Sequence, residues 1–144
     1  MDLGFIGIAA AFTLSALGSA LGVGAAAQAA VGAWKRCYAA NKPAPFAFII
    51  YISAPITQTL YGFILMMQIR DAQANPVAKL AVGLLAGLAI GTSAFFQGRT
   101  GACAADAHGE TGKGMANYIL ALGLIESVAI FVMVLMLITI GTLS

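Results

Sequence analysis

Charged side chains are scarce in this sequence. Only 8% of its 144 residues are Asp, Glu, Lys or Arg, whereas 61% are hydrophobic. A soluble domain carries roughly 25% charged residues, so this composition excludes a protein whose surface is kept in water. The net charge of +2 comes from scattered basic residues, which also excludes nucleic acid as a partner, because its binding requires a clustered basic face.

The groups needed for catalysis and metal binding are equally rare. The chain has one histidine and two cysteines, and it contains no nucleophile–base pair, His/Cys cluster or nucleotide fingerprint. We therefore expect no catalytic site and no cofactor. Cys37 and Cys103 lie near the ends of different predicted helices, and we expect free thiols there. The run 109–114 after His108 invites comparison with a phosphate-binding loop, but that motif needs Gly at 107 and Ser or Thr at 114, where this sequence has Ala107 and Gly114. We therefore expect a flexible loop with His108 in solvent.

The sequence does contain long stretches with few or no charged residues. No charged residue occurs between Asp2 and Lys35, Lys42 and Arg70, or Lys79 and Arg99, and only Glu126 follows Lys113. A membrane-spanning helix needs about 20 predominantly apolar residues. The sequence therefore predicts an all-α membrane protein with four transmembrane helices, at about 3–34, 44–69, 77–106 and 115–143.

Prolines and glycines lie at the short links between these spans, and short links make neighbouring helices antiparallel. We predict two tandem antiparallel hairpins, residues 1–72 and 73–144. The orientation follows from the loop side with more Lys and Arg, which is cytoplasmic. This rule predicts cytoplasmic loops at 35–43 and 107–114 and both termini outside. The start of the chain has no basic segment, so we expect no cleaved signal peptide.

The two hairpins are related by an internal repeat. An offset of 69 residues aligns Gly18, Gly22 and Gln28 with Gly87, Gly91 and Gln97, and it also aligns Thr57 with Glu126. The first and third helices contain glycines spaced four apart, which lets helix backbones approach closely in lipid. Because both glycine-rich helices come first in their hairpin, we expect them to form the inner layer of a closed homo-oligomeric ring.

Glu126 lies about 5 Å from the middle of its span, at 1.5 Å per residue. An ionised carboxylate at that depth costs several kcal/mol unless it is protonated or paired. No basic residue of this chain lies at the same depth, since Arg99 is nearer the helix end and can reach outward. A proton or a metal ion is left as the neutralising species.

The second span offers oxygen atoms at a similar depth. Its polar face comprises Ala54, Thr57, Gln58 and Tyr61, spaced i, i+3, i+4 and i+7. Pro55 removes a backbone N–H there and should free a carbonyl oxygen locally, and such carbonyls often coordinate alkali cations in membranes. With Gln97 from the third span, these residues and Glu126 predict an oxygen-only site of the kind that small hard cations prefer.

The two tandem hairpins, the single Glu of the fourth helix and the segment from Pro55 to Gly62 (PITQTLYG) together resemble the rotor-ring proteolipid of V-type ATPases. The likeness is greatest to the bacterial sodium-translocating type, often called subunit K. Two positions differ from that type, because Ile56 replaces a glycine and Ser127 replaces a threonine. The resemblance implies that the chain is no enzyme itself but an ion-translocating subunit of an ATP-hydrolysing complex in a bacterial plasma membrane.

The resemblance also implies roles for single residues and partners. Glu126 would bind Na⁺ with its carboxylate and Thr57 with its hydroxyl, while Gln58 and Gln97 would bind it with their amide oxygens. Ala54 would add its backbone carbonyl, and Tyr61 would donate a hydrogen bond to Glu126. The partners implied are copies of the chain in a ring, lipid, central-stalk subunits, and a stator membrane subunit with an essential arginine.

Three alternatives remain open on the sequence. In a proton-carrying ring of the same fold, the polar residues would only hold a protonated Glu126. A small four-helix multidrug exporter has a similar size, but its essential Glu lies in the first helix, where this chain has no acid beyond Asp2. A structural tetraspan protein would form junctions or channels without rotation.

Overall fold

A computed structural model describes residues 2–143, which are helical over almost their whole length. The four membrane-length segments of this range are α1 (Leu3–Ala39), a second span made of α2 (Phe48–Ser53), the 3₁₀ turn η1 (Ala54–Ile56) and α3 (Thr57–Asp71), then α4 (Pro76–Thr111) and α5 (Met115–Thr142). Each is long and apolar enough to cross a bilayer. The predicted all-α architecture with four spans is confirmed.

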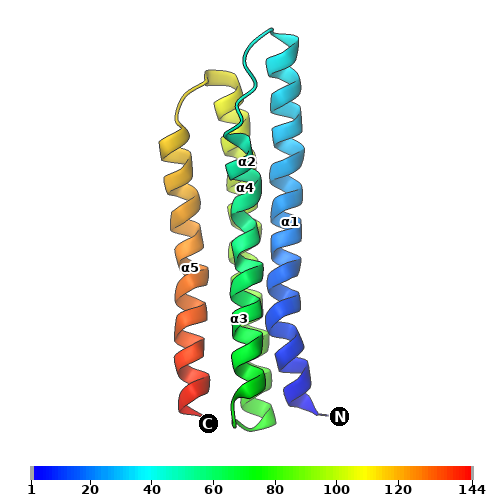
Figure 1. Ribbon diagram of the computed structural model, residues 1–144, viewed down its shortest axis with the longest axis vertical. Coiled ribbons are helices and arrows are strands. Elements are labelled where there is room, and N and C mark those ends of the chain that lie inside the picture. The colour runs from blue at the N-terminus through cyan, green and yellow to red at the C-terminus, as the bar shows by residue number, and fades with distance from the viewer. Residues whose placement is uncertain (1, 144) are drawn as a thin grey trace.

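The helices run alternately up and down along one common axis (Figure 1). The connections 40–47 and 112–114 lie together at one end of the bundle, which we call the loop end. The start of α1, the end of α5 and the connection 72–75 lie at the opposite end, which we call the terminal end. The predicted division into hairpins 1–72 and 73–144 stays a prediction, since α1 packs along α4 as well as against its own hairpin partner.

Local chemistry determines where the helices begin and end. The Asp2 side chain accepts a hydrogen bond from the Gly4 N–H (2.9 Å) at the start of α1, and Asn75 caps α4 by accepting from the Ala78 N–H (2.9 Å). Such caps satisfy N–H groups that have no partner within the helix. Gly112 ends α4 in the left-handed conformation at φ +67°, which costs glycine no steric strain.

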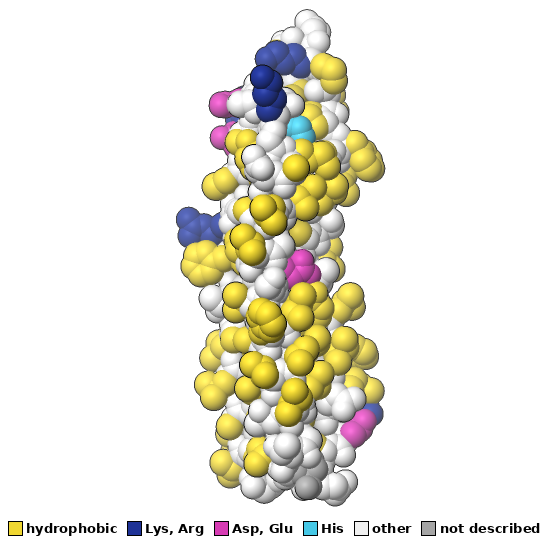
Figure 2. Space-filling model, turned by 90° about the vertical axis from the view of Figure 1, so that its left-hand side faces the viewer, with side chains coloured by type: hydrophobic (Ala, Val, Ile, Leu, Met, Phe, Trp, Pro, Cys, Tyr) yellow, Lys and Arg dark blue, Asp and Glu magenta, His cyan; other side chains and the backbone are white. Residues whose placement is uncertain are grey.

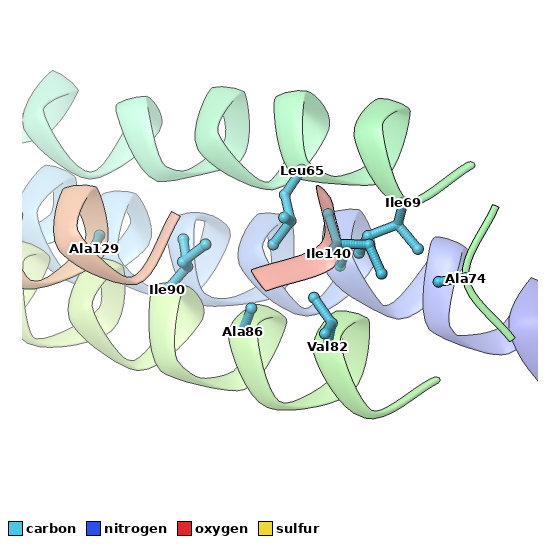
Figure 3. Packing of buried hydrophobic residues seen from close by; sticks show 9 residues of the cluster. Leu65, Ile69, Ala74, Val82, Ala86, Ile90, Ala129 and Ile140 are labelled. Atoms are coloured by element: carbon cyan, nitrogen blue, oxygen red, sulfur yellow. The ribbon is translucent and has the colours of Figure 1, made fainter. Parts of the chain in front are cut away.

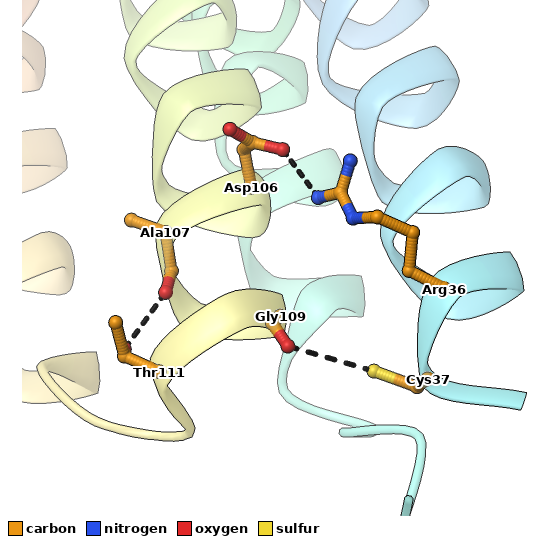
Figure 4. Close-up of polar contacts among 6 residues, drawn as sticks. All are labelled: Arg36, Cys37, Asp106, Ala107, Gly109 and Thr111. Carbon is orange, nitrogen blue, oxygen red and sulfur yellow. Dashed lines mark hydrogen bonds and ion pairs between the residues drawn. The ribbon is translucent and has the colours of Figure 1, made fainter. Parts of the chain in front are cut away.

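The loops at the loop end are shorter than the sequence suggested. We predicted loops at 35–43 and 107–114, but α1 continues to Ala39 and α4 to Thr111. At 35–43 the prediction was wrong because it took the first charged residue, Lys35, as the end of the helix. At 107–114 it was wrong because it treated the whole glycine-rich run as a loop, whereas α4 continues past Gly109. Charged residues are compatible with a helix outside the apolar layer, and here the Arg36 and Asp106 side chains form an ion pair between α1 and α4 (Figure 4).

Glycines let α1 and α4 pack backbone to backbone. A Cβ added at Gly18 would lie 2.0 Å from the carbonyl oxygen of Gly91, and one at Gly83 would lie 1.9 Å from the carbonyl oxygen of Gly7. A Cβ at Gly98 would similarly lie 2.1 Å from the oxygen of Gly22. The predicted close approach of the two glycine-rich helices is therefore present over several helical turns.

The second span and α5 cover one side of this pair. Leu65 and Ile69 of α3 pack with Ile90 of α4 and with Ala129 and Ile140 of α5 in a buried apolar cluster (Figure 3). The outer surface remains strongly apolar. On the face shown in Figure 2, hydrophobic side chains are spread over the middle of the molecule, and charged side chains lie mainly toward its ends. An exposed apolar surface of this extent is typical of contact with lipid or with further protein.

Cys37 and Cys103 are free thiols, as predicted. Cys37 is buried at the loop end, where its Sγ lies 3.8 Å from the carbonyl oxygen of Gly109 (Figure 4). Cys103 is exposed on α4.

Candidate ion-binding site

Glu126 lies close to the midpoint of α5, about 4 Å from it along the helix axis. Its side chain is half-buried, and its neighbours Leu124 and Val128 are exposed apolar residues. Two side chains donate hydrogen bonds to the carboxylate. The Tyr61 hydroxyl donates to Oε1 (2.7 Å), and the Gln97 amide donates to Oε2 over a longer distance (3.4 Å). α3 and α4 therefore both reach the carboxylate.

A break in the second span supplies further oxygen atoms. Pro55 has no N–H to offer to the carbonyl of Tyr51, and the chain forms the 3₁₀ turn η1 at this point before α3 begins. The Thr57 hydroxyl lies 3.0 Å from the Ala54 carbonyl oxygen and 3.1 Å from Gln58 Oε1. Hydroxyl, carbonyl and amide oxygens are thus gathered at the start of α3.

Two buried glutamines connect this turn to the carboxylate. Gln58 and Gln97 are fully buried, and the Gln58 amide donates to Gln97 Oε1 (2.7 Å). The Gln97 amide in turn donates to the Leu122 carbonyl on α5 (3.0 Å) and to Glu126. Buried amides without partners are costly, so this continuous hydrogen bonding explains why two glutamines can lie between the helices.

The six residues selected from the sequence therefore lie in one connected group. It runs from Tyr61 through Glu126, Gln97 and Gln58 to Thr57 and the Ala54 carbonyl. Chemically, the group combines one carboxylate with neutral oxygen donors. Whether this group holds an ion stays a prediction.

No fixed cation compensates Glu126 within residues 2–143. The ion pairs there join Arg36 to Asp106 and Arg70 to Asp71, all at exposed positions. Arg99, the basic residue nearest in depth by sequence, lies over the Phe95 ring with its guanidinium carbon 5.8 Å from the ring centroid. The carboxylate consequently depends on hydrogen-bond donors alone in a single copy of the chain.

Sequence reasoning missed Ser93. Its side chain is buried on α4 and donates to the Ile125 carbonyl (2.8 Å), one residue before Glu126. Ser93 and Gln97 are spaced i and i+4, so they share a face, and they hold two backbone carbonyls of α5. That spacing was visible in the sequence, but a lone serine in a small-residue helix gave no reason to single it out.

The prediction for His108 was wrong. The residue lies within α4 rather than in a loop, is only 8% exposed, and forms a 2.9 Å hydrogen bond with the Tyr51 hydroxyl. The sequence suggested solvent because glycines follow at 109, 112 and 114. The helix passes through the first of these and ends only at Gly112, which keeps His108 on a buried face.

The family described as the C subunit of ATP synthase has a model that matches residues 80–139. The match covers most of α4 and α5 and includes both Gln97 and Glu126. No curated protein matches the chain. Together with the four membrane-length helices, the match supports an integral membrane protein. Residues 80–139 are thus similar to the C subunit of ATP synthase.

Proposed function

We propose that the chain is the rotor-ring subunit of a V-type ATPase and that it carries Na⁺ across the membrane on Glu126. The observation that carries the proposal is the environment of this carboxylate. It lies near the middle of a membrane-length helix, receives hydrogen bonds from Tyr61 and Gln97, and has no basic side chain within ion-pairing distance in residues 2–143. A mobile cation is the species that neutralises it.

The neighbouring groups favour a metal ion over a bare proton. A protonated carboxyl needs one acceptor for its hydrogen, whereas Na⁺ needs several oxygens around it. Oxygen atoms from Thr57, Gln58, Gln97 and the Ala54 carbonyl lie in the same hydrogen-bonded group as Glu126. The proposed ligands are these four residues and the carboxylate, with Tyr61 holding the carboxylate by its hydroxyl.

Ion binding would reverse the two buried amides. Gln97 directs its NH₂ group toward Glu126 and its oxygen toward Gln58. A cation beside the carboxylate requires an oxygen there instead, so the Gln97 amide turns by half a rotation and its NH₂ group also leaves the Leu122 carbonyl. The Gln97 NH₂ group then faces Gln58, and the Gln58 amide turns as well so that its oxygen accepts a hydrogen bond from Gln97. An amide can turn in this way without changing its volume, because its O and NH₂ ends have nearly the same size.

Transport follows from the charge of the occupied and empty states. With Na⁺ bound the site is neutral and can face lipid, whereas the empty carboxylate is an anion that hydrocarbon excludes. A stator subunit with an essential arginine attracts the empty carboxylate, and ATP hydrolysis elsewhere in the complex turns the ring through central-stalk subunits. Moving each charge requires about 2.3 kcal/mol per 100 mV. One Glu126 per chain makes the number of ions per turn equal to the number of copies.

The chain's surface suits a ring in a membrane. Apolar side chains remain exposed on all four spans, and an open apolar groove of about 740 Å³ runs between α4 and α5 beside the site. Further copies and lipid cover these surfaces. We place the loop end, with Lys35, Arg36, Lys42 and Lys113, in the cytoplasm of a bacterial cell and the terminal end outside.

The second candidate function is a proton-translocating ring of the same fold. The half-buried position of Glu126 between the exposed apolar residues Leu124 and Val128 favours it, because protonation alone neutralises a carboxylate in apolar surroundings. The exporter and tetraspan alternatives have no such support, since neither requires a deep acid on the fourth span.

Carbodiimide labelling of the purified ring tests the proposal. The reagent modifies protonated carboxyl groups, so NaCl at fixed pH should suppress labelling of Glu126, and KCl at equal ionic strength should not. Glu126→Gln should abolish labelling, whereas Glu110→Gln, which alters an exposed acid at the loop end, should leave it unchanged. Labelling that is insensitive to Na⁺ would assign the ring to protons. A stable monomer would exclude a rotor ring altogether.

A further inference from the structure

A second buried polar contact lies outside the ion site, at the loop end. His108 of α4 and Tyr51 of α2 form a 2.9 Å hydrogen bond. Tyr51 and its neighbour Phe48 are fully buried. The Phe48 ring stacks on Trp34 (5.7 Å between centroids) and meets the His108 ring edge-on (5.5 Å), and Tyr118 of α5 packs against Tyr51 (6.3 Å). This aromatic cluster joins all four spans.

α2 depends on such contacts for its position. The helix has only six residues, and no side chain caps its start at Ala47. The backbone continues from α2 through η1 into α3, but Pro55 cannot donate to the Tyr51 carbonyl, so one helical hydrogen bond is missing at the junction. A missing bond of this kind weakens the link between α2 and α3. The side chains that α2 buries therefore contribute to its placement relative to α3.

One stripe of α4 holds the second span above and below η1. Gln97, Gly101 and His108 are spaced i, i+4 and i+11, so they share a buried face. Gln97 accepts a hydrogen bond from Gln58, which follows η1, and His108 bonds Tyr51, which precedes it. Between them the Tyr51 carbonyl packs so closely on Gly101 that a Cβ there would lie 2.6 Å from the oxygen.

The turn that carries the ion-site oxygens is thus bracketed by two hydrogen bonds to the same helix. Ala54 belongs to η1 and Thr57 follows it directly. Tyr51 precedes Ala54 by three residues, one helical turn. If the hydrogen bond between Tyr51 and His108 is lost, α2 can rotate or slide along α4. η1 then moves with α2, because the remaining hydrogen bond, from Gln58 to Gln97, holds the second span only on the α3 side of η1. The Ala54 carbonyl and the Thr57 hydroxyl would then leave their places beside the glutamines.

We propose that Tyr51 and His108 are positioning residues for ion binding: their hydrogen bond sets the placement of η1 and hence the affinity of the site for Na⁺. The inference rests on the proposed function of Glu126. It adds two residues that influence Na⁺ affinity from the α2 side of η1 without contacting the ion. Both residues act through α2 and neither is a ligand.

Substitutions of Tyr51 and His108 test this role in the purified rotor ring. Tyr51→Phe and His108→Phe each remove the hydrogen bond and keep an aromatic side chain, and Tyr118→Phe is the matched control in the same cluster. The readout is the Na⁺ concentration that halves carbodiimide labelling of Glu126, with the thermal stability of the ring measured alongside. We expect Tyr51→Phe and His108→Phe each to raise this concentration about threefold to tenfold, as the loss of one hydrogen bond implies.

Three further results follow from a shared hydrogen bond. The double variant should be no worse than either single variant, because the second change removes nothing more. His108→Gln, whose amide can still bond the Tyr51 hydroxyl, should recover most of the Na⁺ affinity. Tyr118→Phe should resemble the wild type, and none of the variants should greatly change the melting temperature of the ring.

The outcomes separate this inference from the proposed function. If labelling of the wild type ignores Na⁺, the proposed function fails and the inference with it. If the wild type responds to Na⁺ but Tyr51→Phe responds equally, the inference alone is overturned. It is also overturned if the two single effects add in the double variant, or if Na⁺ affinity falls only in variants whose rings have lost thermal stability.

Discussion

The hydroxyl of Tyr61 can be removed without changing the shape of its side chain, which makes Tyr61→Phe a clean perturbation of the ion site. In the structure this hydroxyl donates to Glu126 Oε1 at 2.7 Å, the shortest contact that the carboxylate receives. The variant keeps the aromatic ring of residue 61 in place and removes this donor. The carboxylate then retains the longer bond from Gln97 (3.4 Å).

The size of the effect follows from the charge of the acceptor. Hydrogen bonds to charged groups contribute about 1.5–3 kcal/mol. Tyr61 and Glu126 are both half-buried, so we expect the lower end of this range, about 1.5 kcal/mol, which corresponds to roughly a tenfold change in an equilibrium constant. The bond stabilises the anionic carboxylate that holds Na⁺ more than the protonated one. Its loss should therefore raise the Na⁺ concentration needed to compete with protons.

The assay is carbodiimide labelling of purified rings at one fixed pH over a range of NaCl concentrations. Tyr61→Phe should need roughly ten times more Na⁺ for half-maximal protection. Tyr38→Phe is the control, because Tyr38 is exposed near the loop end of α1, far along the helix from the site. An unchanged protection curve for Tyr61→Phe would refute the role assigned to this bond, and so would an equal shift in the control.

Two other substitutions have definite expected outcomes. Gly18→Val should lower the free energy of unfolding by about 1–3 kcal/mol, because even a Cβ would lie 2.0 Å from the Gly91 oxygen where ordinary contacts are 3.4–4 Å. A lower melting temperature and loss of the detergent-resistant oligomer would show this effect. Gly141→Ala, at a position with open space around it, should match the wild type. Gln97→Leu should leave the buried Gln58 amide without its acceptor, at a cost of about 1–3 kcal/mol, and should abolish Na⁺ protection at concentrations that protect the wild type; a variant still protected by the same NaCl concentration would contradict the assignment of Gln97 as a ligand.

The spans were predictable because hydrocarbon imposes one simple condition on sequence, the absence of charge over about 20 residues. The helix ends were less predictable, since charge marks the edge of the apolar layer and not the last helical residue. α1 and α4 both extend beyond the layer, to Ala39 and Thr111. The close approach of α1 and α4 followed from glycine spacing, because few other reasons exist for glycines four apart in a membrane helix.

The polar group around Glu126 was predictable for a related reason. Polar side chains are costly in a membrane interior, so the few that occur there are drawn together, and Tyr61, Gln97 and Glu126 do lie within hydrogen-bonding distance. The roles of Ser93 and His108 were not predicted, because they depend on which face of α4 turns toward the neighbouring helices. A register of helix against helix is decided by packing in three dimensions, and a single sequence shows only which residues share a face.

The central claim is that Glu126 is neutralised by a bound Na⁺ and not by a fixed basic group. Equilibrium binding of radioactive ²²Na⁺ to the purified ring tests it most directly. The account predicts saturation at one Na⁺ per chain, complete loss of binding in Glu126→Gln, and competition by protons as the pH falls. A ring that binds no Na⁺ at saturating concentration, or one in which a lysine or arginine of another subunit is permanently paired with Glu126, would contradict it.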